Sequence, residues 1–441
     1  VLSNNKTIKS GKVSLDIAPQ ASKEFTVPVN GLKSQPGTEY FVNFSVTTVE
    51  PEPLIPAGYE IAYDQFQLPI QAEKRIYKAN GPALTTATSG DELTVSSSKV
   101  NFVFNKKSGL VTSYKVDGTE YFKDGFGIQP NFWRAPNDND YGNGAPKRLQ
   151  VWKQSSKNFH VTDVKMTTEN KVVSLKATYL LAAGNLYVVT YRIYPSGIVN
   201  VSAQFTSTDM QAAETEVSEA TRMATFTPGS DAARKAASKL EVPRIGVRFR
   251  LPAQMNNVQY FGRGPEENYI DRNHGTLVGV YKTTADKMYF NYVRPQENGH
   301  HTDTRWIALS PDKGNGLAIV ADSLIGFNAL RNSIEDFDSE EALPHPYQWN
   351  NFSPEEVANH DEKAARNVLR RMHHVNDITP RDFVEVCVDM KQQGVGGYDS
   401  WGARPEPFHQ IPANRDYSWG FTLVPVRSAS QANEVAKYDY Q

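Results

Sequence analysis

Apolar and polar residues alternate with a period of two along most of this chain, which is the pattern of strands that bury one face. The clearest case spans residues 187–205, where apolar side chains occupy every second position on both sides of the turn Pro195-Ser-Gly197. Residues 100–104 and 245–251 repeat the alternation. Many such segments, separated by glycine and proline turns, predict an all-β fold built from antiparallel sandwiches.

The same pattern divides the chain into two parts. Short apolar alternations that predict strands in the first part lie at residues 13–17, 25–29 and 41–46. They fit a small immunoglobulin-like sandwich. Residues 70–91 are polar and predict a crossover, so the first domain with its linker is placed at residues 1–82. No second break follows, and residues 83–441 are predicted to form one large antiparallel sandwich.

Two segments depart from the strand pattern. Ser353-Pro-Glu-Glu356 has the residues of a capping box with proline in the first turn, and it predicts a surface helix that continues to residue 373. Residues 209–240 are rich in alanine, glutamate and serine, and predict an irregular insertion.

Composition narrows the classes of protein to which the chain can belong. It has 441 residues, 39% hydrophobic and 11% aromatic, and its net charge of −2 argues against nucleic acid or an anionic membrane as the main partner. No run of about eighteen apolar residues occurs, so no membrane span is expected. Cys387 is the only cysteine and lies in an alternating segment, which predicts a buried structural thiol. The first residues lack an initiator methionine and a signal peptide, as expected for a piece of a longer protein, so they do not indicate the compartment; a soluble bacterial-type protein of the cytoplasm or periplasm is expected.

Four stretches combine glycines or prolines, which fix the backbone, with carboxylates, amides and aromatic rings, a combination typical of a binding site or a contact surface. They are residues 131–140, 260–269, 292–299 and 394–402. Trp401 stands on a turn between glycines, where an exposed indole can stack on the apolar face of a pyranose; packing beneath a loop is the alternative. The run Asn137-Asp-Asn-Asp140 offers ligands for a hard cation, but its spacing favours a turn that caps its own backbone amides.

Other ionisable residues are candidates for chemistry by residue type alone. One group consists of Glu266, Glu267, Asp271 and Arg272. A glycosidase uses such carboxylates as acid and base, although ion pairing or capping of amides is the favoured interpretation. His300 and His301 follow Glu297, and adjacent histidines on a strand point apart, so a shared metal is not expected. The sequence has no Walker loop, HExxH or GxSxG motif.

Together the four stretches resemble the C-terminal region of the large β-galactosidases of glycoside hydrolase family two. Residues 11–19 and 58–66 resemble the linker sandwich of these enzymes, so the similarity covers essentially the whole chain. The resemblance implies an immunoglobulin-like sandwich followed by a galactose-mutarotase-like antiparallel supersandwich. In that family the catalytic glutamates sit on a barrel that precedes this region. The resemblance therefore implies a portion of a retaining β-galactosidase that has no catalytic residue of its own and is inactive alone.

The resemblance also implies which residues lie near a sugar. Trp401, with Asp399 and Ser400, matches the turn that contacts the substrate, chiefly its leaving-group sugar. A loop that shifts at the pocket rim is matched by Gly142, Asn143, Gly144 and Arg148. The metal ions of the family are held mainly by the barrel, so no metal ligand or cofactor is assigned to this portion, and Mg²⁺ or Ca²⁺ belongs to the complete enzyme. The implied partners are the barrel, the galactoside and further copies of the enzyme, while Tyr398 departs from the acidic or amide residue usual in the family.

Three other functions are compatible with the residues. A stand-alone carbohydrate-binding module would bind sugar through Trp401 without a barrel. An aldose-epimerase-like protein would need a histidine acid and a glutamate base that meet in the groove of the sandwich. The candidates for that pair are His300, His301 or His374 with Glu297 or Glu385. A domain that only stabilises an enzyme or its oligomer is the structural alternative.

Overall fold

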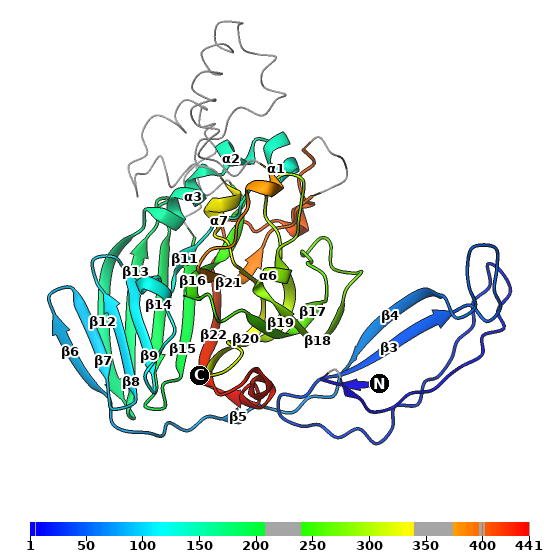
Figure 1. Cartoon of the computed structure of the whole chain (residues 1–441), viewed down its shortest axis with the longest axis horizontal. Helices are drawn as coiled ribbons and strands as arrows, with labels where there is room; N and C mark the ends of the chain where they lie inside the picture. The colour runs from blue at the N-terminus through cyan, green and yellow to red at the C-terminus, as the bar shows by residue number, and fades with distance from the viewer. Residues whose placement is uncertain (5, 208–239, 339–373, 397–398, 400–401, 441) are drawn as a thin grey trace, which may run out of the picture.

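The computed structural model describes the chain except residues 5, 208–239, 339–373, 397–398, 400–401 and 441 (Figure 1). The described part consists mainly of antiparallel strands joined by turns and short helices, so the predicted all-β class is confirmed. The insertion expected at residues 209–240 lies outside the described residues apart from residue 240, and so does the helix expected from Ser353 to residue 373. Among the helices of the described part, none is both long and apolar enough to cross a membrane.

The first part of the chain forms a four-stranded sheet in the order β2-β1-β3-β4. Its strands are β1 (Leu2–Ser3), β2 (Lys6–Thr7), β3 (Tyr40–Thr47) and β4 (Glu60–Leu68). The hairpin of β3 and β4 extends away from the large sheets (Figure 1). The strands predicted at 13–17 and 25–29 are not formed, and Val13 is 61% exposed. This corrects the prediction: an extended segment becomes a strand only where a neighbour accepts its backbone hydrogen bonds, and in the described structure these two segments have no such neighbour.

The segment predicted as a polar crossover, residues 70–91, contains two short strands. They are β5 (Arg75–Ile76), which pairs in parallel with β23 (Tyr438–Asp439), and β6 (Thr85–Ser89), which begins the next sheet. Tyr77 packs against Tyr194 and Tyr440 with ring centroids 5.5 Å and 5.1 Å away. The crossover is therefore anchored beside the last strand of the chain.

Two further sheets make up the rest of the described chain. The smaller has the order β10-β9-β8-β7-β6, and the larger follows the path β11-β16-β21-β20-β22-β15-β14-β13-β12, with β19, β17 and β18 continuing from β20. The strands of the smaller sheet are completed by β7 (Glu92–Ser96), β8 (Val100–Asn105), β9 (Leu110–Val116) and β10 (Thr119–Glu120). The strands of the larger sheet are β11 (Gln129–Asn131), β12 (His160–Glu169), β13 (Val172–Leu180), β14 (Leu186–Ile193), β15 (Val199–Thr206), β16 (Arg244–Pro252), β17 (Asn257–Gly264), β18 (Leu277–Thr284), β19 (His301–Ser310), β20 (Gly316–Leu330), β21 (Phe383–Gln392) and β22 (Tyr417–Val426). The hairpin predicted over residues 187–205 is confirmed as β14 and β15.

The helices are short and lie in the connections between strands. They are η1 (Lys123–Gly125), α1 (Asp138–Gly142), α2 (Ala145–Arg148), α3 (Gln150–Lys157), α6 (Ala285–Met288), α7 (Ile334–Phe337), η3 (Val375–Asp377), η4 (Pro407–His409), η5 (Ala429–Gln431) and α9 (Ala432–Val435). Figure 1 shows α1, α2, α3 and α7 gathered at one end of the large sheet. That end is where the polar loops described below come together.

The main core lies between the five-stranded sheet and the large sheet. Phe102 of β8 packs against Tyr191 of β14 with ring centroids 5.6 Å apart, and both side chains are fully buried. Phe122, which follows β10, packs against Phe249 of β16 at the same distance of 5.6 Å. Cys387 on β21 is 2% exposed, and burial raises the pKa of its thiol, so the predicted buried structural cysteine is confirmed.

The first sheet is attached to the large sheet through β18. The side-chain amide of Gln65 on β4 donates to the Val278 carbonyl at 2.9 Å and accepts from the Val278 N–H at 2.8 Å, as a neighbouring strand would. The Glu39 carboxylate pairs with the Arg305 guanidinium of β19 at 2.7 Å. In the described structure β17 is the strand that pairs with β18, and Gln65 occupies part of the opposite edge.

Candidate functional site

The four stretches singled out in the sequence meet in space, beginning with the first and the fourth. Arg134 is buried and donates to the Gly394 carbonyl at 3.1 Å. Asn137 donates from its side-chain amide to the Val395 carbonyl at 3.0 Å. Buried donors of the first stretch thus fix the backbone at the start of the fourth, close to α1 (Figure 1).

The run Asn137-Asp-Asn-Asp140 caps the start of α1. The Asn137 side chain accepts from the Asp140 N–H at 2.8 Å, and the Asp140 carboxylate accepts from the Asn137 N–H at 3.1 Å. Asp140 also pairs with Arg134 at 3.1 Å. These oxygens are engaged with donors, so the capping interpretation is confirmed. Within the described ranges, no group of three or more histidine, cysteine, aspartate or glutamate side chains is arranged to hold a metal ion.

Carboxylates near the second stretch hold two of the other stretches in place. Asp271 accepts from two backbone N–H groups of the fourth stretch, at 3.0 Å and 2.9 Å. Glu267 pairs with Arg272 at 2.8 Å and accepts from the Gly299 N–H of the third stretch at 2.7 Å. Both carboxylates therefore act as bridges between loops, which is the interpretation favoured from the sequence over acid–base chemistry.

A cation of the third stretch reaches α1. One nitrogen of Arg294 lies 3.7 Å from a carboxylate oxygen of Asp138, and the guanidinium carbon lies 3.7 Å from the centre of the Tyr141 ring. Gln296 donates from its side-chain amide to the same Asp138 carboxylate at 3.5 Å. All four stretches are thereby joined into one loop cluster.

The residues predicted at the pocket rim lie side by side wherever the structure describes them. An ideal Cβ placed on Gly402 would lie 2.5 Å from the carbonyl carbon of Gly142 and 2.7 Å from the nitrogen of Asn143, so the turn that ends at Gly402 packs directly on the predicted loop. Asp399 accepts from the Ala403 N–H at 3.1 Å within that turn. Residues Tyr398, Ser400 and Trp401 lie outside the described residues, and the sugar contacts expected of Asp399, Ser400 and Trp401 stay predictions.

The far end of the predicted loop is held by Arg148, the last residue of α2. Arg148 pairs with Glu241 and donates to the side-chain oxygen of Asn143 at 3.2 Å. Arg404 pairs with the same Glu241 at 3.3 Å. Gly144 has a φ of 70°, in the left-handed region that favours glycine. The loop is therefore tied down at both ends, with a glycine at its sharpest turn.

A second polar cluster, which the sequence analysis did not single out as a whole, lies buried on one face of the large sheet. Its strand residues stand in register on β16 and β21: Gly246 opposite Asp389, Arg248 opposite Cys387 and Arg250 opposite Glu385. Arg244 lies 3.0 Å from Glu297 and 3.2 Å from Asp389. The sequence does contain a pattern that marks this cluster. Arginine or glycine alternates with apolar residues over 244–250, and acidic residues or cysteine alternate with apolar residues over 385–389. Such alternation ordinarily indicates a solvated face, whereas here loops cover it.

Burial shifts the ionisation of this cluster. Loss of contact with water raises the pKa of Asp389 to about 7 and raises that of Glu297, and the attraction of Arg244 offsets only part of the effect. Burial also lowers the pKa of His300, whose Nδ1 lies 3.8 Å from Asp389. His301 turns the other way, to two backbone carbonyls at 3.0 Å and 3.2 Å, so the predicted divergence of the two histidines is confirmed.

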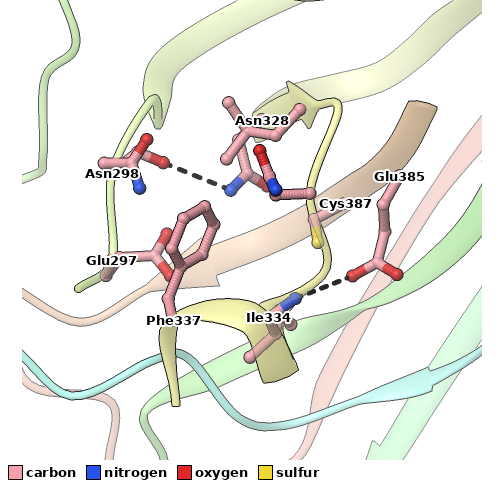
Figure 2. Close-up of a pocket in the computed structure, with 9 residues that line it drawn as sticks. Glu297, Asn298, Asn328, Ile334, Phe337, Glu385 and Cys387 are labelled. Carbon is pink, nitrogen blue, oxygen red and sulfur yellow. Dashed lines mark hydrogen bonds between the residues drawn. The ribbon is translucent and has the colours of Figure 1, made fainter. Parts of the chain in front are cut away.

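A cavity of about 10 Å³ adjoins this cluster (Figure 2). It is lined by Glu297, Asn298, Asn328, Leu330, Asn332, Ile334, Phe337, Glu385 and Cys387. A volume of this size holds about one water molecule. The cavity beside two of the epimerase candidates, Glu297 and Glu385, is therefore far too small for a sugar ring.

Comparison with known proteins adds two family matches in succession along the chain. The model of β-galactosidase domain 4 matches residues 1–69, and the model of the β-galactosidase small chain matches residues 96–423. β-Galactosidases of Priestia megaterium and Streptococcus thermophilus are 31% and 24% identical to this chain over 427 and 432 residues. These alignments cover 96% and 97% of this chain but 35% of each of those proteins. The chain thus spans about a third of the length of these curated relatives.

Solved structures with a related course of the chain include a galactose 1-epimerase from Lactobacillus acidophilus. The TM-score is 0.38 and the identity 9%, over 79% of this chain and 98% of that one. This likeness is too distant to bear on function. The small-chain match, by contrast, extends over more than half of the sequence. The chain belongs to the β-galactosidase small chain family.

Proposed function

We propose that this chain is the C-terminal, non-barrel portion of a retaining β-galactosidase, an enzyme that hydrolyses terminal non-reducing β-D-galactose residues. The observation that carries the proposal is the succession of two β-galactosidase family matches, together with relatives of that name of which the chain spans about a third. On this proposal residues 1–82 correspond to the linker domain and residues 83–441 to the terminal domain. The remaining length of the relatives corresponds to the part that carries the catalytic barrel.

In this role the loop cluster shapes the rim of the sugar pocket. Trp401 stacks on the leaving-group sugar, and Asp399 and Ser400 add polar contacts on the same turn. The loop from Gly142 to Arg148 forms the other predicted part of the rim. The close packing of Gly402 on the Gly142 backbone supports the proposal, because Gly402 directly follows the predicted sugar-binding turn in sequence.

The acid and the nucleophile come from the barrel of the complete enzyme. A retaining glycosidase needs two carboxyl groups about 5 Å apart that face the sugar. In the loop cluster, Glu267 and Asp271 are instead bound to an arginine and to backbone N–H groups. The chain alone is therefore inactive, and any Mg²⁺ or Ca²⁺ is a property of the complete enzyme.

The first sheet supplies a contact surface for the barrel. Large apolar side chains of this sheet and of the segments between its strands are unusually exposed, and a soluble protein rarely leaves so many in water. They are Ile8, Val13, Leu15, Ile17, Phe25, Val27, Phe44, Val49, Leu54, Tyr59, Ile61, Tyr63 and Phe66. Covering them in the complete enzyme would fix this portion against the catalytic part.

Hydrolysis of a chromogenic β-galactoside tests the proposal. The chain alone should be inactive, whereas the complete enzyme, and the chain mixed with the separately produced barrel, should be active. Activity of the chain alone would contradict the absence of catalytic residues and would bring back Glu266, Glu267 and Glu297 as candidates. Galactoside binding by the chain alone, with no activity on mixing, would favour a carbohydrate-binding module.

Substitution of Trp401 tests the rim role within the complete enzyme. Trp401→Ala should raise KM about two- to tenfold, the value of one aromatic stacking contact, without lowering the thermal midpoint. Leu186→Ala, which removes an exposed apolar side chain of β14 far along the chain, serves as the control. Unchanged kinetics for the Trp401 variant would contradict the assigned contact.

A further inference from the structure

We infer that Arg294 is a positioning residue that fixes the rim loop and thereby determines how well the enzyme accepts a large leaving group. The inference rests on the proposed function and deepens it by naming the side chain on which the rim depends. Arg294 lies in the third stretch, far in sequence from both predicted rim segments. It is not among the residues expected to contact sugar. Its role follows from what it contacts.

Arg294 contacts α1 near both ends of that short helix, at Asp138 and at Tyr141. Its guanidinium lies over the Tyr141 ring at 3.7 Å from the ring centre, and it lies 3.7 Å from the Asp138 carboxylate at the start of the helix. The side chains of Arg294 and Asp138 are 37% and 59% exposed, so the ion pair is screened by water and contributes little. Stacking of the flat guanidinium on the Tyr141 ring, together with its hydrogen bond to the Tyr141 hydroxyl, is therefore the main contact, and a lysine cannot reproduce the stacking.

The segment that carries Arg294 is itself held rigidly. Pro295 is buried, and Glu297 forms a buried ion pair with Arg244 at 3.0 Å. Asn298 donates to the Gln296 carbonyl at 2.9 Å, and Gln296 donates from its side chain to the Arg294 carbonyl at 3.2 Å. Arg294 thus projects from a fixed base, and it is α1 that is positioned by the contact.

A displacement of α1 is transmitted directly to the sugar-facing turn. The helix ends at Gly142, and Gly402 lies so close to the Gly142 carbonyl and the Asn143 nitrogen that even one added carbon would overlap them. The turn that carries Asp399 and the end of α1 therefore shift together. Without Arg294, α1 keeps its buried ion pair between Arg134 and Asp140 but loses its contact with the third stretch, so the rim loop that follows Tyr141 is less firmly fixed.

The complete enzyme is the material for the test, assayed with an aryl β-galactoside and with a β-galactosyl disaccharide. Arg294→Met should lower kcat/KM for the disaccharide about two- to fivefold, mainly through KM, because the lost stacking contact is partly exposed and its loss depopulates the competent rim. The aryl substrate, whose leaving group reaches less of the rim, should lose less. Arg294→Lys should behave like the methionine variant, because a lysine cannot stack flat on the Tyr141 ring.

Arg305→Met is the matched control. Arg305 also pairs with a carboxylate, Glu39, and lies 5.4 Å from an aromatic ring centre, that of Phe261, but it joins the first sheet to β19. Equal losses for the Arg294 and Arg305 variants, full activity of Arg294→Lys, or equal losses on both substrates would each overturn the inference while leaving the proposed function intact. An inactive unsubstituted enzyme would overturn the proposed function and the inference with it.

Discussion

Asp389 offers a sharp test of the buried polar cluster, because its replacement by asparagine keeps the shape and removes the charge. The carboxyl group is fully buried and lies 3.2 Å from the Arg244 guanidinium and 3.8 Å from the His300 ring. Its oxygens accept no hydrogen bond in the described structure, so the approach of Arg244 is an ion pair without an aligned donor. Burial accordingly raises its pKa from 3.8 to about 7.

The sign and size of the effect follow from this pKa. Between pH 3.8 and about 7 the folded protein keeps a proton on Asp389 that the unfolded chain has lost, so stability is full at low pH and declines as the pH rises towards 7. The decline is about 1.4 kcal/mol per pH unit, which amounts to about 3 kcal/mol from pH 4.5 to 7. Asparagine cannot ionise, so the variant Asp389→Asn lacks this contribution.

Urea denaturation of the two proteins at pH 4.5 and pH 7.5, followed by tryptophan fluorescence, measures the effect. The difference in unfolding free energy between them should move by about 3 kcal/mol in favour of the variant as the pH rises. The comparison of the two proteins removes the pH dependence of titratable groups distant from Asp389, which is the same in both. Asp163→Asn, on the exposed strand β12, controls for removal of a carboxylate. A difference that is the same at both pH values would refute the reasoning.

Two more substitutions test the packing of the sheets. In Gly246→Ala the new carbon would lie 2.6 Å from the Val388 carbonyl oxygen and still closer to Asp389, so β16 and β21 must separate. The free energy of unfolding should fall by about 3 kcal/mol in urea denaturation. An unchanged denaturation midpoint would contradict this close approach. Glu39→Gln removes the charge that pairs with Arg305 and should weaken the attachment of the first sheet by about 1 kcal/mol. Limited proteolysis between the sheets should then be faster, and equal cleavage rates would show that the ion pair does not stabilise the attachment.

The fold could be predicted from the sequence wherever a strand buries one face and leaves the other in water. The hairpin of β14 and β15 is such a case, because the apolar residues at alternate positions from Tyr187 to Ile193 and from Val199 to Phe205 are buried in the core. The same pattern failed at residues 13–17 and 25–29, because alternation reports a side chain's preference and not the presence of a partner strand. Tertiary contacts decide that second condition.

The candidate site was only partly predictable for a related reason. Glycines and prolines beside polar residues marked all four stretches correctly as contact-making, since rigid turns are visible locally. The contact of Arg294 with Tyr141 joins the third stretch to α1, which is far away in the sequence, and no local pattern encodes such a pairing. The charged face around Asp389 was missed because its alternation is also that of a solvated strand, and only the covering loops make it interior.

The side-chain amide of Gln65 on the edge of β18 bears on the solubility of the molecule. An open strand edge is a template onto which another chain can add, and edge-to-edge addition is a common route to aggregation. Gln65 occupies both hydrogen-bonding groups of Val278 and so withdraws that part of the edge from competition. Since β4 precedes β18 in the chain, it is already synthesised when β18 emerges from the ribosome. Gln65 is therefore available to bind the edge of β18 before another strand can pair with that edge.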